Sequence, residues 1–198
     1  VPLLMEGLKR LEYRGYDSSG LASIVGGVIE RRRAQGKLTN LAAVLANSPL
    51  AGSVALGHTR WATHGKPNEI NAHPHTDPTG TVAVIHNGII ENYLELKDRM
   101  IAAGAKFESE TDTEVLAHLV AEKLVKLQPP GSAPKGDLNE PLLFEAVRLA
   151  LADVRGAYAV AVLWSKAPGV IVAAKTASPL IIGLGEGETF LGSDVPAF

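Results

Sequence analysis

The sequence of 198 residues contains no cysteine. This absence excludes disulfide bonds, thiolate metal sites and a cysteine nucleophile from these residues. Long apolar runs are missing too, since no uninterrupted stretch reaches membrane-spanning length, and the first residues lack the pattern of a signal peptide. We therefore expect a cytoplasmic protein that does not act at a membrane.

An excess of charge of either sign is also missing. A formal charge of -2 and a pI near 6.3 provide no basic field for nucleic acid or for an acidic lipid surface. The only basic run, Arg31-Arg32-Arg33, lies beside a strand-like stretch and is most simply a solvated strand edge. With 46% hydrophobic residues, an ordinary value for a globular chain, we expect one domain with a substantial core.

The periodicity of the apolar residues predicts an α+β domain. Helical spacing predicts a first helix that ends near residue 11 and further helices over 38–45, 91–103 and 141–154. Another predicted helix follows the motif at 109–114 and continues to residue 127. Apolar or β-branched runs predict strands over 21–25, 27–33, 53–56, 81–85, 105–108, 157–164, 170–174, 180–183 and 189–192. Several of these strands are apolar on both faces, so we expect sheets buried between layers of helices.

Two segments are predicted to be loops. Residues 128–138 contain Pro-Pro-Gly-Ser-Ala-Pro and are expected to be a surface loop or insertion. The polar, proline-rich segment Lys66 to Gly80 is long for a connection in a compact domain, and such loops tend to be functional. We expect this segment to fold over a site. The glycines of 183–187 are expected to form a hairpin turn rather than a phosphate loop.

Two motifs each follow a predicted strand, where sites are usually built. They are His58-Thr59-Arg60-Trp61-Ala62-Thr63-His64-Gly65 and His86-Asn87-Gly88-Ile89-Ile90-Glu91-Asn92. Arg60 offers a planar fork of donors that suits a carboxylate. Asn87 and Gly88 offer a side-chain amide and an unhindered backbone N–H that can converge on one oxygen. An anion clamp beside an oxyanion site suggests acyl transfer on a charged small molecule.

Each of these residues also has an ordinary structural interpretation. Arg60 alone is typical of a surface ion pair, and Asn87-Gly88 is a common hairpin turn. Asp112 fits a helix cap, because Ser109-x-x-Asp112 resembles a capping box. Spacing alone does not explain why these residues occur together, and their combination favours the interpretation as a site.

The histidines raise a metal site as an alternative. His73-x-His75 could supply two ligands, with His58, His64 or His86 as a third. Against this, the pair lies in a proline-rich loop with only Asp77 nearby. We therefore expect no metal and no cofactor.

Five motifs occur in a fixed order along the chain. They are the two motifs above together with Glu12-Tyr13-Arg14-Gly15-Tyr16-Asp17-Ser18, Asn71-Ala72-His73-Pro74-His75 and Ser109-Glu110-Thr111-Asp112-Thr113-Glu114. Together they closely resemble the glutaminase domains of the glutamine:fructose-6-phosphate aminotransferase (isomerizing) family. The resemblance implies an N-terminal nucleophile hydrolase fold, a four-layer αββα sandwich with two stacked antiparallel sheets.

The resemblance also implies a reaction. In the family, an N-terminal cysteine attacks the side-chain amide of L-glutamine, with its own α-amino group as base. The glutamyl thioester is hydrolysed, and ammonia passes to an isomerase domain that converts fructose 6-phosphate to glucosamine 6-phosphate. The partners implied are these two substrates and a second copy of the full-length chain. Because the cysteine and the isomerase domain are absent here, we expect 1–198 to be a glutaminase domain truncated at both ends and inactive alone.

Roles for individual residues follow from the same resemblance. Arg60 is expected to hold the α-carboxylate of glutamine and Asp112 its α-ammonium group. Asn87 and Gly88 are expected to stabilise the tetrahedral oxyanion. The other predicted site residues are Thr63 and His64 in the pocket, Trp61 at the ammonia exit, and Arg14 and Asp17 beside the nucleophile. Two alternatives stay open, namely a non-catalytic glutamine-binding module and the glutaminase domain of another class II amidotransferase.

Overall fold

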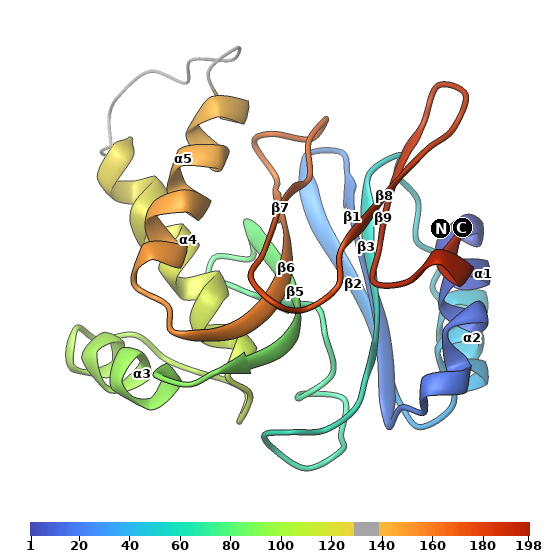
Figure 1. The fold of residues 1–198 in the computed structure, drawn as a ribbon, viewed down its shortest axis with the longest axis horizontal. Coiled ribbons are helices and arrows are strands. Elements are labelled where there is room, and N and C mark those ends of the chain that lie inside the picture. Colours follow the sequence, from blue (N-terminus) through green and yellow to red (C-terminus); the bar gives the residue numbers. More distant parts are fainter. Residues whose placement is uncertain (129–138) are drawn as a thin grey trace.

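Four layers form the chain in a computed structural model that describes residues 1–128 and 139–198 (Figure 1). Two antiparallel sheets face each other in the middle, and helices cover the outer face of each sheet. The predicted α+β class and αββα layering are confirmed. The loop predicted at 128–138 lies outside the described residues, apart from Gln128. Within the described part, no helix is both long and apolar enough to span a membrane.

The first sheet has the strand order β2-β1-β3. Its strands are β1 (Ser18–Val25), β2 (Val28–Gln35) and β3 (Ala55–Arg60). Its outer face is covered by α1 (Pro2–Arg10) and α2 (Leu38–Asn47), which pack through leucines with the right helical spacing. The predicted turn at Gly26 and Gly27 is confirmed, because both glycines have a positive φ and the flanking Val25 and Val28 pair.

The second sheet has the order β4-β5-β6-β7. Its strands are β4 (His75–Thr76), β5 (Val82–Ile90), β6 (Gly156–Trp164) and β7 (Val172–Lys175). Its outer face is covered by α4 (Thr113–Leu127) and α5 (Asn139–Ala152), while α3 (Tyr93–Ala102) follows β5. The core between the two sheets consists of Ala22, Ile24, Ile29, Leu56, Ala83, Ala161 and Leu163. Because three of these are alanines, the sheets approach closely and residues of β3 and β5 can meet.

Both site motifs begin inside strands and run past their ends, so the prediction that they follow strands is wrong for the first residues of each motif. β3 runs through His58 to Arg60, and β5 continues past Gly88 to Ile90. β5 pairs with β6 without interruption, from Val82 opposite Trp164 to Ile90 opposite Gly156. The polar residues were predicted as loop because one side of each strand faces a cavity instead of a core, which breaks the apolar pattern of a buried strand.

One predicted strand does not form. Residues 105–108 have an irregular backbone that leads from α3 toward α4. The backbone N–H of Glu108 donates to the carboxylate of Glu114 (2.8 Å) instead of to a neighbouring strand. A side chain of the following helix thus satisfies a donor that a sheet would otherwise pair.

The basic run on β2 is not a solvated edge. Arg33 donates to the carbonyl oxygens of Ile70 (3.0 Å) and Ala72 (3.2 Å), and Arg31 donates to that of Pro74 (3.3 Å). Burial lowers the pKa of Arg33 to about 10. The arginines therefore hold the 66–80 segment against the first sheet.

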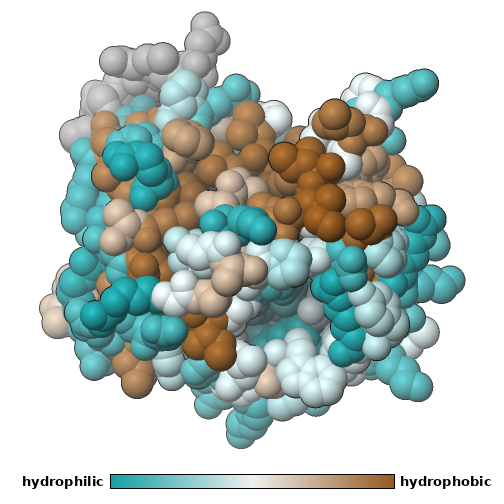
Figure 2. Space-filling view, viewed as in Figure 1, coloured by the Kyte–Doolittle hydropathy of each residue, from teal (hydrophilic) through white to brown (hydrophobic). Residues whose placement is uncertain are grey.

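The predicted hairpin near the end of the chain is confirmed. It consists of β8 (Ile181–Leu184) and β9 (Thr189–Gly192), joined by a turn in which Gly185 donates to the carbonyl oxygen of Glu188 (3.0 Å). Short 3-10 helices, η1 (Glu12–Arg14) and η3 (Val195–Ala197), bring the two ends of the chain together (Figure 1). Figure 2 shows apolar surface beside the hairpin, where Ile182 and Leu184 are exposed. One edge of this surface borders the cavity described next.

Candidate active site

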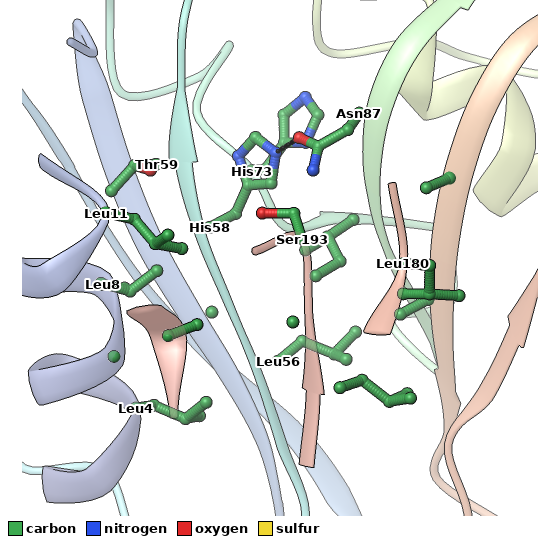
Figure 3. A pocket seen from close by; sticks show the side chains of 18 of the residues that line it. Leu4, Leu8, Leu11, Leu56, His58, Thr59, His73, Asn87, Leu180 and Ser193 are labelled. Atoms are coloured by element: carbon green, nitrogen blue, oxygen red, sulfur yellow. Dashed lines mark hydrogen bonds between the residues drawn. The ribbon is translucent and has the colours of Figure 1, made fainter. Parts of the chain in front are cut away.

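A cavity of about 1270 Å³ opens between the two sheets and is bordered by the β8–β9 hairpin. Leucines of α1 and β3 line one part of it, and His58, His73 and Asn87 lie at the other end (Figure 3). The predicted site residues on its wall are Arg14, Arg60, Trp61, Thr63, His64, Asn87, Gly88 and Asp112. Asp17 is not part of that wall, but it contacts Arg60. The fold thus gathers residues from five separate sequence motifs around one space.

Arg60 is buried at the end of β3, with 4% of its surface exposed. Its Nη2 donates to the carbonyl oxygens of His64 and Gly65, the latter at 2.9 Å. Burial lowers the pKa of Arg60, and the carboxylates of Asp17 and Asp112 oppose this effect. The guanidinium therefore stays charged while it fixes the turn that carries Thr63 and His64.

Asp17 and Arg14 act on the surroundings of the cavity. Asp17 accepts from Ser18 Oγ (2.8 Å) and from the backbone N–H of Ala62, and lies 3.5 Å from Arg60 Nη1. Arg14 donates to Ser193 Oγ (2.9 Å) and pairs with Asp194 (2.7 Å). Asp17 therefore shapes the turn after β3, and Arg14 ties η1 to the end of β9. The sequence showed these two as part of a motif but did not show these contacts.

Trp61 and the half-buried His64 lie at the rim of the cavity. Trp61 has 69% of its surface exposed and lies over Gly15, where a Cβ would be 2.4 Å from the indole ring. His64 contacts Thr63 Oγ1 (3.3 Å) and packs edge-on against Tyr93, with 4.8 Å between the ring centroids. This rim borders the part of the cavity that Arg60 lines.

Asp112 is buried just before α4, with 3% exposed. Its Oδ2 accepts the backbone N–H of Ile90 (2.9 Å) and lies 3.9 Å from His86 Nδ1. The capping interpretation of Asp112 is wrong, since its carboxylate binds β5 and, among the described residues, makes no cap bond to its own helix. The carboxylate thus joins α4 to the strand that carries Asn87 and Gly88.

Glu114, and not Asp112, reaches back to Ser109. Its Oε2 accepts from the backbone N–H and the hydroxyl of Ser109, both at 2.6 Å. Burial alone would favour the neutral acid, but the His118 ring at 3.6 Å and hydrogen bonds from Ser109 and the Glu108 backbone outweigh it and lower the pKa of Glu114 to about 2. The segment before α4, including Asp112, is fixed in this way.

Gly88 lies within β5 at a φ of +125°. A Cβ there would lie 2.0 Å from the carbonyl oxygen of Ala157 on β6. Glycine is therefore the residue that lets β5 keep its pairing with β6 at this position. Asn87, its neighbour, directs its side chain to the cavity wall beside His58 (Figure 3).

Four buried histidines lie at this end of the cavity, and His58, His73 and His86 line it. The rings of His58 and His73 stack with 4.2 Å between centroids, and His75 meets His73 edge-on at 4.9 Å. Thr113 Oγ1 lies 3.2 Å from His73 Nε2 and 3.0 Å from His86 Nδ1. Burial lowers the pKa of His58 to about 4 and that of His75 to about 3, so both rings are neutral at pH 7.

The histidines bind hydroxyl and amide groups. Among residues 1–128 and 139–198, no group of three or more His, Cys, Asp or Glu side chains is placed to hold a metal ion. The sequence raised these histidines only as possible metal ligands. The contact of His58 with Asn87 was missed, because the two residues belong to different sheets and no local pattern connects them.

Comparison with known proteins defines the class. Residues 45–127 match the glutamine amidotransferase domain family. Two solved structures share the fold over the whole chain at 26% identity: the glutamine phosphoribosylpyrophosphate amidotransferase of B. subtilis, with a TM-score of 0.76 over 40% of that chain, and an allosteric regulatory enzyme of purine biosynthesis, with 0.78 over 40%. The chain therefore contains a glutamine amidotransferase domain with the N-terminal nucleophile hydrolase fold.

The particular relatives are glutamine–fructose-6-phosphate aminotransferases (isomerizing). The chain is 52% identical to that of Symbiobacterium thermophilum over 100% of its length, 54% identical to that of Rhizobium meliloti over 98%, and 53% identical to that of Thermus thermophilus over 98%. It spans 29–30% of the length of these relatives. The resemblance to the glutaminase region of this family, predicted from five motifs, is confirmed.

Proposed function

We propose that this chain binds L-glutamine and is the part of an aminotransferase that releases ammonia from it. One observation carries the proposal: Arg60, Asp112, Asn87 and Gly88 lie on the wall of a single cavity. A guanidinium and a carboxylate suit the two charged ends of a free amino acid. An amide N–H and a backbone N–H suit the oxygen of the side-chain amide that is attacked.

The nucleophile of this reaction is proposed to be a cysteine outside the 198 residues, which contain none. Its thiolate forms a bond to the amide carbon of glutamine, and the carbonyl electrons move to oxygen. The α-amino group of the cysteine passes the proton that it took from the thiol to the amide nitrogen, so that collapse of the oxyanion expels ammonia and leaves a glutamyl thioester. Water then hydrolyses the thioester to glutamate and restores the thiol. Each donor from Asn87 or Gly88 is expected to lower the barrier by about 3 kcal/mol, or about two orders of magnitude in rate.

The acceptor of the ammonia is proposed to be fructose 6-phosphate. This rests on identities of 52–54% to aminotransferases with that name. Residues 1–198 are then the glutaminase domain, an isomerase domain elsewhere in the intact protein completes glucosamine 6-phosphate, and we expect a cytoplasmic homodimer. A purine-pathway amidotransferase is the alternative, since two such proteins share the fold at 26% identity.

A glutaminase assay on the intact protein tests the proposal. We expect glutamate release from L-glutamine, and in Arg60→Ala a rise in KM of about 100-fold, because the α-carboxylate loses its fork. Glutamate release that Arg60→Ala leaves unchanged would contradict it. Replacement of the nucleophilic cysteine by alanine should abolish release and keep glutamine binding.

The acceptor is tested separately with the same intact protein. We expect fructose 6-phosphate to be converted to an amino sugar in a glutamine-dependent way, whereas phosphoribosyl pyrophosphate should be inert. Glutamine binding without any release of glutamate would favour the non-catalytic module.

A further inference from the structure

The side chain of Asn87 can stabilise an oxyanion in only one of its two orientations. Its nitrogen carries two N–H donors, while its oxygen carries only lone pairs. If the amide were turned by 180°, lone pairs would face the developing negative charge and raise the barrier. Some contact must therefore distinguish the two ends of this amide.

His58 makes that contact. Its Nε2 lies 2.9 Å from Asn87 Oδ1, with His58 on β3 and Asn87 on β5. His58 is nearly buried, with 8% of its surface exposed. Figure 3 shows the amide oxygen facing the imidazole rings and the amide nitrogen turned away from them. The contact joins the two sheets at the end of the cavity where the predicted oxyanion donors lie.

The protonation of His58 follows from its surroundings. Burial lowers its pKa to about 4, so the ring carries a single N–H at neutral pH. Among the described residues, Nδ1 has no hydrogen-bond partner. A proton on Nε2 pairs a donor with the Asn87 carbonyl, whereas a proton on Nδ1 would set two lone pairs against each other. The Nε2–H form is therefore favoured.

The plane of the imidazole is also fixed. The His58 ring stacks on His73 at an interplanar angle of 21°, and His73 Nε2 lies 3.2 Å from Thr113 Oγ1. Rotation of His58 would break the stack within a buried cluster. The donor thus reaches Asn87 from a defined direction without any contact to the reacting atoms.

We propose that His58 is a positioning residue: its Nε2–H binds Asn87 Oδ1 and holds the two N–H groups of the amide toward the cavity. This rests on the proposed glutaminase function. Loss of the donor should leave glutamine binding intact and weaken only the stabilisation of the oxyanion, because Arg60 and Asp112 are untouched.

The test uses the intact protein and the pair His58→Phe and His58→Gln. Phenylalanine keeps a flat ring against His73 but donates nothing, whereas glutamine can donate an N–H. We expect His58→Phe to lower kcat for glutamate release about 10- to 100-fold with KM for glutamine within about twofold. The kcat of His58→Gln should be higher than that of His58→Phe, with a decrease in log kcat no more than about half as large.

Two controls separate positioning from loss of structure. His118 is also buried and stacked on a ring, with 4.1 Å to Phe107, but does not line the cavity. His118→Phe should leave kcat within about twofold. In a double-mutant cycle, adding His58→Phe to Asn87→Ala should cause no further loss, since the amide to be positioned is gone.

An aldehyde analogue of glutamine gives a second measurement. Addition of the thiolate to L-glutamate γ-semialdehyde produces a tetrahedral oxygen in the position of the oxyanion. We expect His58→Phe to weaken its inhibition by the same factor as kcat, while L-glutamate inhibits as before. An unchanged kcat in His58→Phe, or a further loss in the double variant, would overturn the proposal for His58. An inactive parent protein would instead overturn the proposed function.

Discussion

The two sides of the cavity are built in different ways. The side proposed to stabilise the oxyanion, here the oxyanion side, consists of His58, Asn87 and Gly88, which lie within strands of two facing sheets. The side proposed to bind the charged ends of glutamine, here the recognition side, consists of Arg60, the rim residues 61–65 and Asp112, which lie where elements end or begin. The first is fixed by strand pairing and the second by single side chains that bind backbone groups.

This difference matches the demands of the proposed reaction. Donors for a developing charge work best when they need no rearrangement, and two paired strands provide that. A site that admits a free amino acid must be reached from solvent, and Trp61, 69% exposed, lies at its rim. We therefore expect changes on the oxyanion side to act on kcat and changes on the recognition side to act on KM.

Gly88→Ala should have the largest effect. The new Cβ would lie 2.0 Å from the carbonyl oxygen of Ala157, at a φ of +125°. β5 must then move away from β6, so we expect kcat for glutamate release to fall more than about 100-fold. Gly80→Ala is the matched control, because Gly80 also has a positive φ but no atom within 4 Å of the added Cβ. Its kcat should be unchanged, and equal losses in the two variants would contradict this account.

Asp112→Asn should act on the recognition side. Asparagine keeps the shape and can still accept from Ile90, but it loses the charge that would hold the α-ammonium group. We expect KM for glutamine to rise about 10- to 100-fold with a smaller change in kcat, measured by steady-state glutamate release. Asp98→Asn on the exposed face of α3 is the charge-matched control. If both variants have the same KM, Asp112 does not bind the substrate.

Acid should destabilise the fold through its buried histidines. Burial lowers the pKa of His75 to about 3, whereas a histidine in an unfolded chain titrates near pH 6.5. The unfolded state therefore binds more protons below about pH 6.5, and stability falls from there as the pH decreases toward 3. Each such histidine should contribute about 1 kcal/mol per pH unit.

Denaturant unfolding of the intact protein at pH 7.5, 6.5 and 5.5 measures this loss. His75→Gln removes one titrating group and should reduce the slope of the unfolding free energy against pH, although it lowers stability at pH 7.5. Equal slopes in the parent and the variant would show that His75 is not the group responsible.

Trp61→Ala should have the smallest effect on the fold. The side chain is exposed and lies over Gly15, so we expect the free energy of unfolding to change by about 0.5 kcal/mol or less. Glutamate release should stay within about threefold, while the amino sugar formed per glutamate should decrease if Trp61 retains ammonia. A destabilisation as large as that of Gly88→Ala would mean that the rim is as rigid as the strands.

Local patterns in the sequence predicted much of the fold. Helical spacing of leucines in α1 and α2 and the paired glycines at 26 and 27 require only neighbouring residues to be interpreted. The order of the motifs identified the family, and that resemblance placed Arg60, Asn87 and Asp112 in one candidate site. Each single motif depends only on residues that are close along the chain.

Contacts between distant segments were decided by the tertiary structure. The length of β5 depends on its pairing with β6. The position of Arg33 depends on the carbonyl oxygens of residues 70 and 72, and the orientation of Asn87 depends on His58 in the opposite sheet. By itself, the sequence determined which side chains are available and which elements carry them. Only the packing of one sheet on the other determined which of them meet, because hydrogen bonds and burial depend on distance in space.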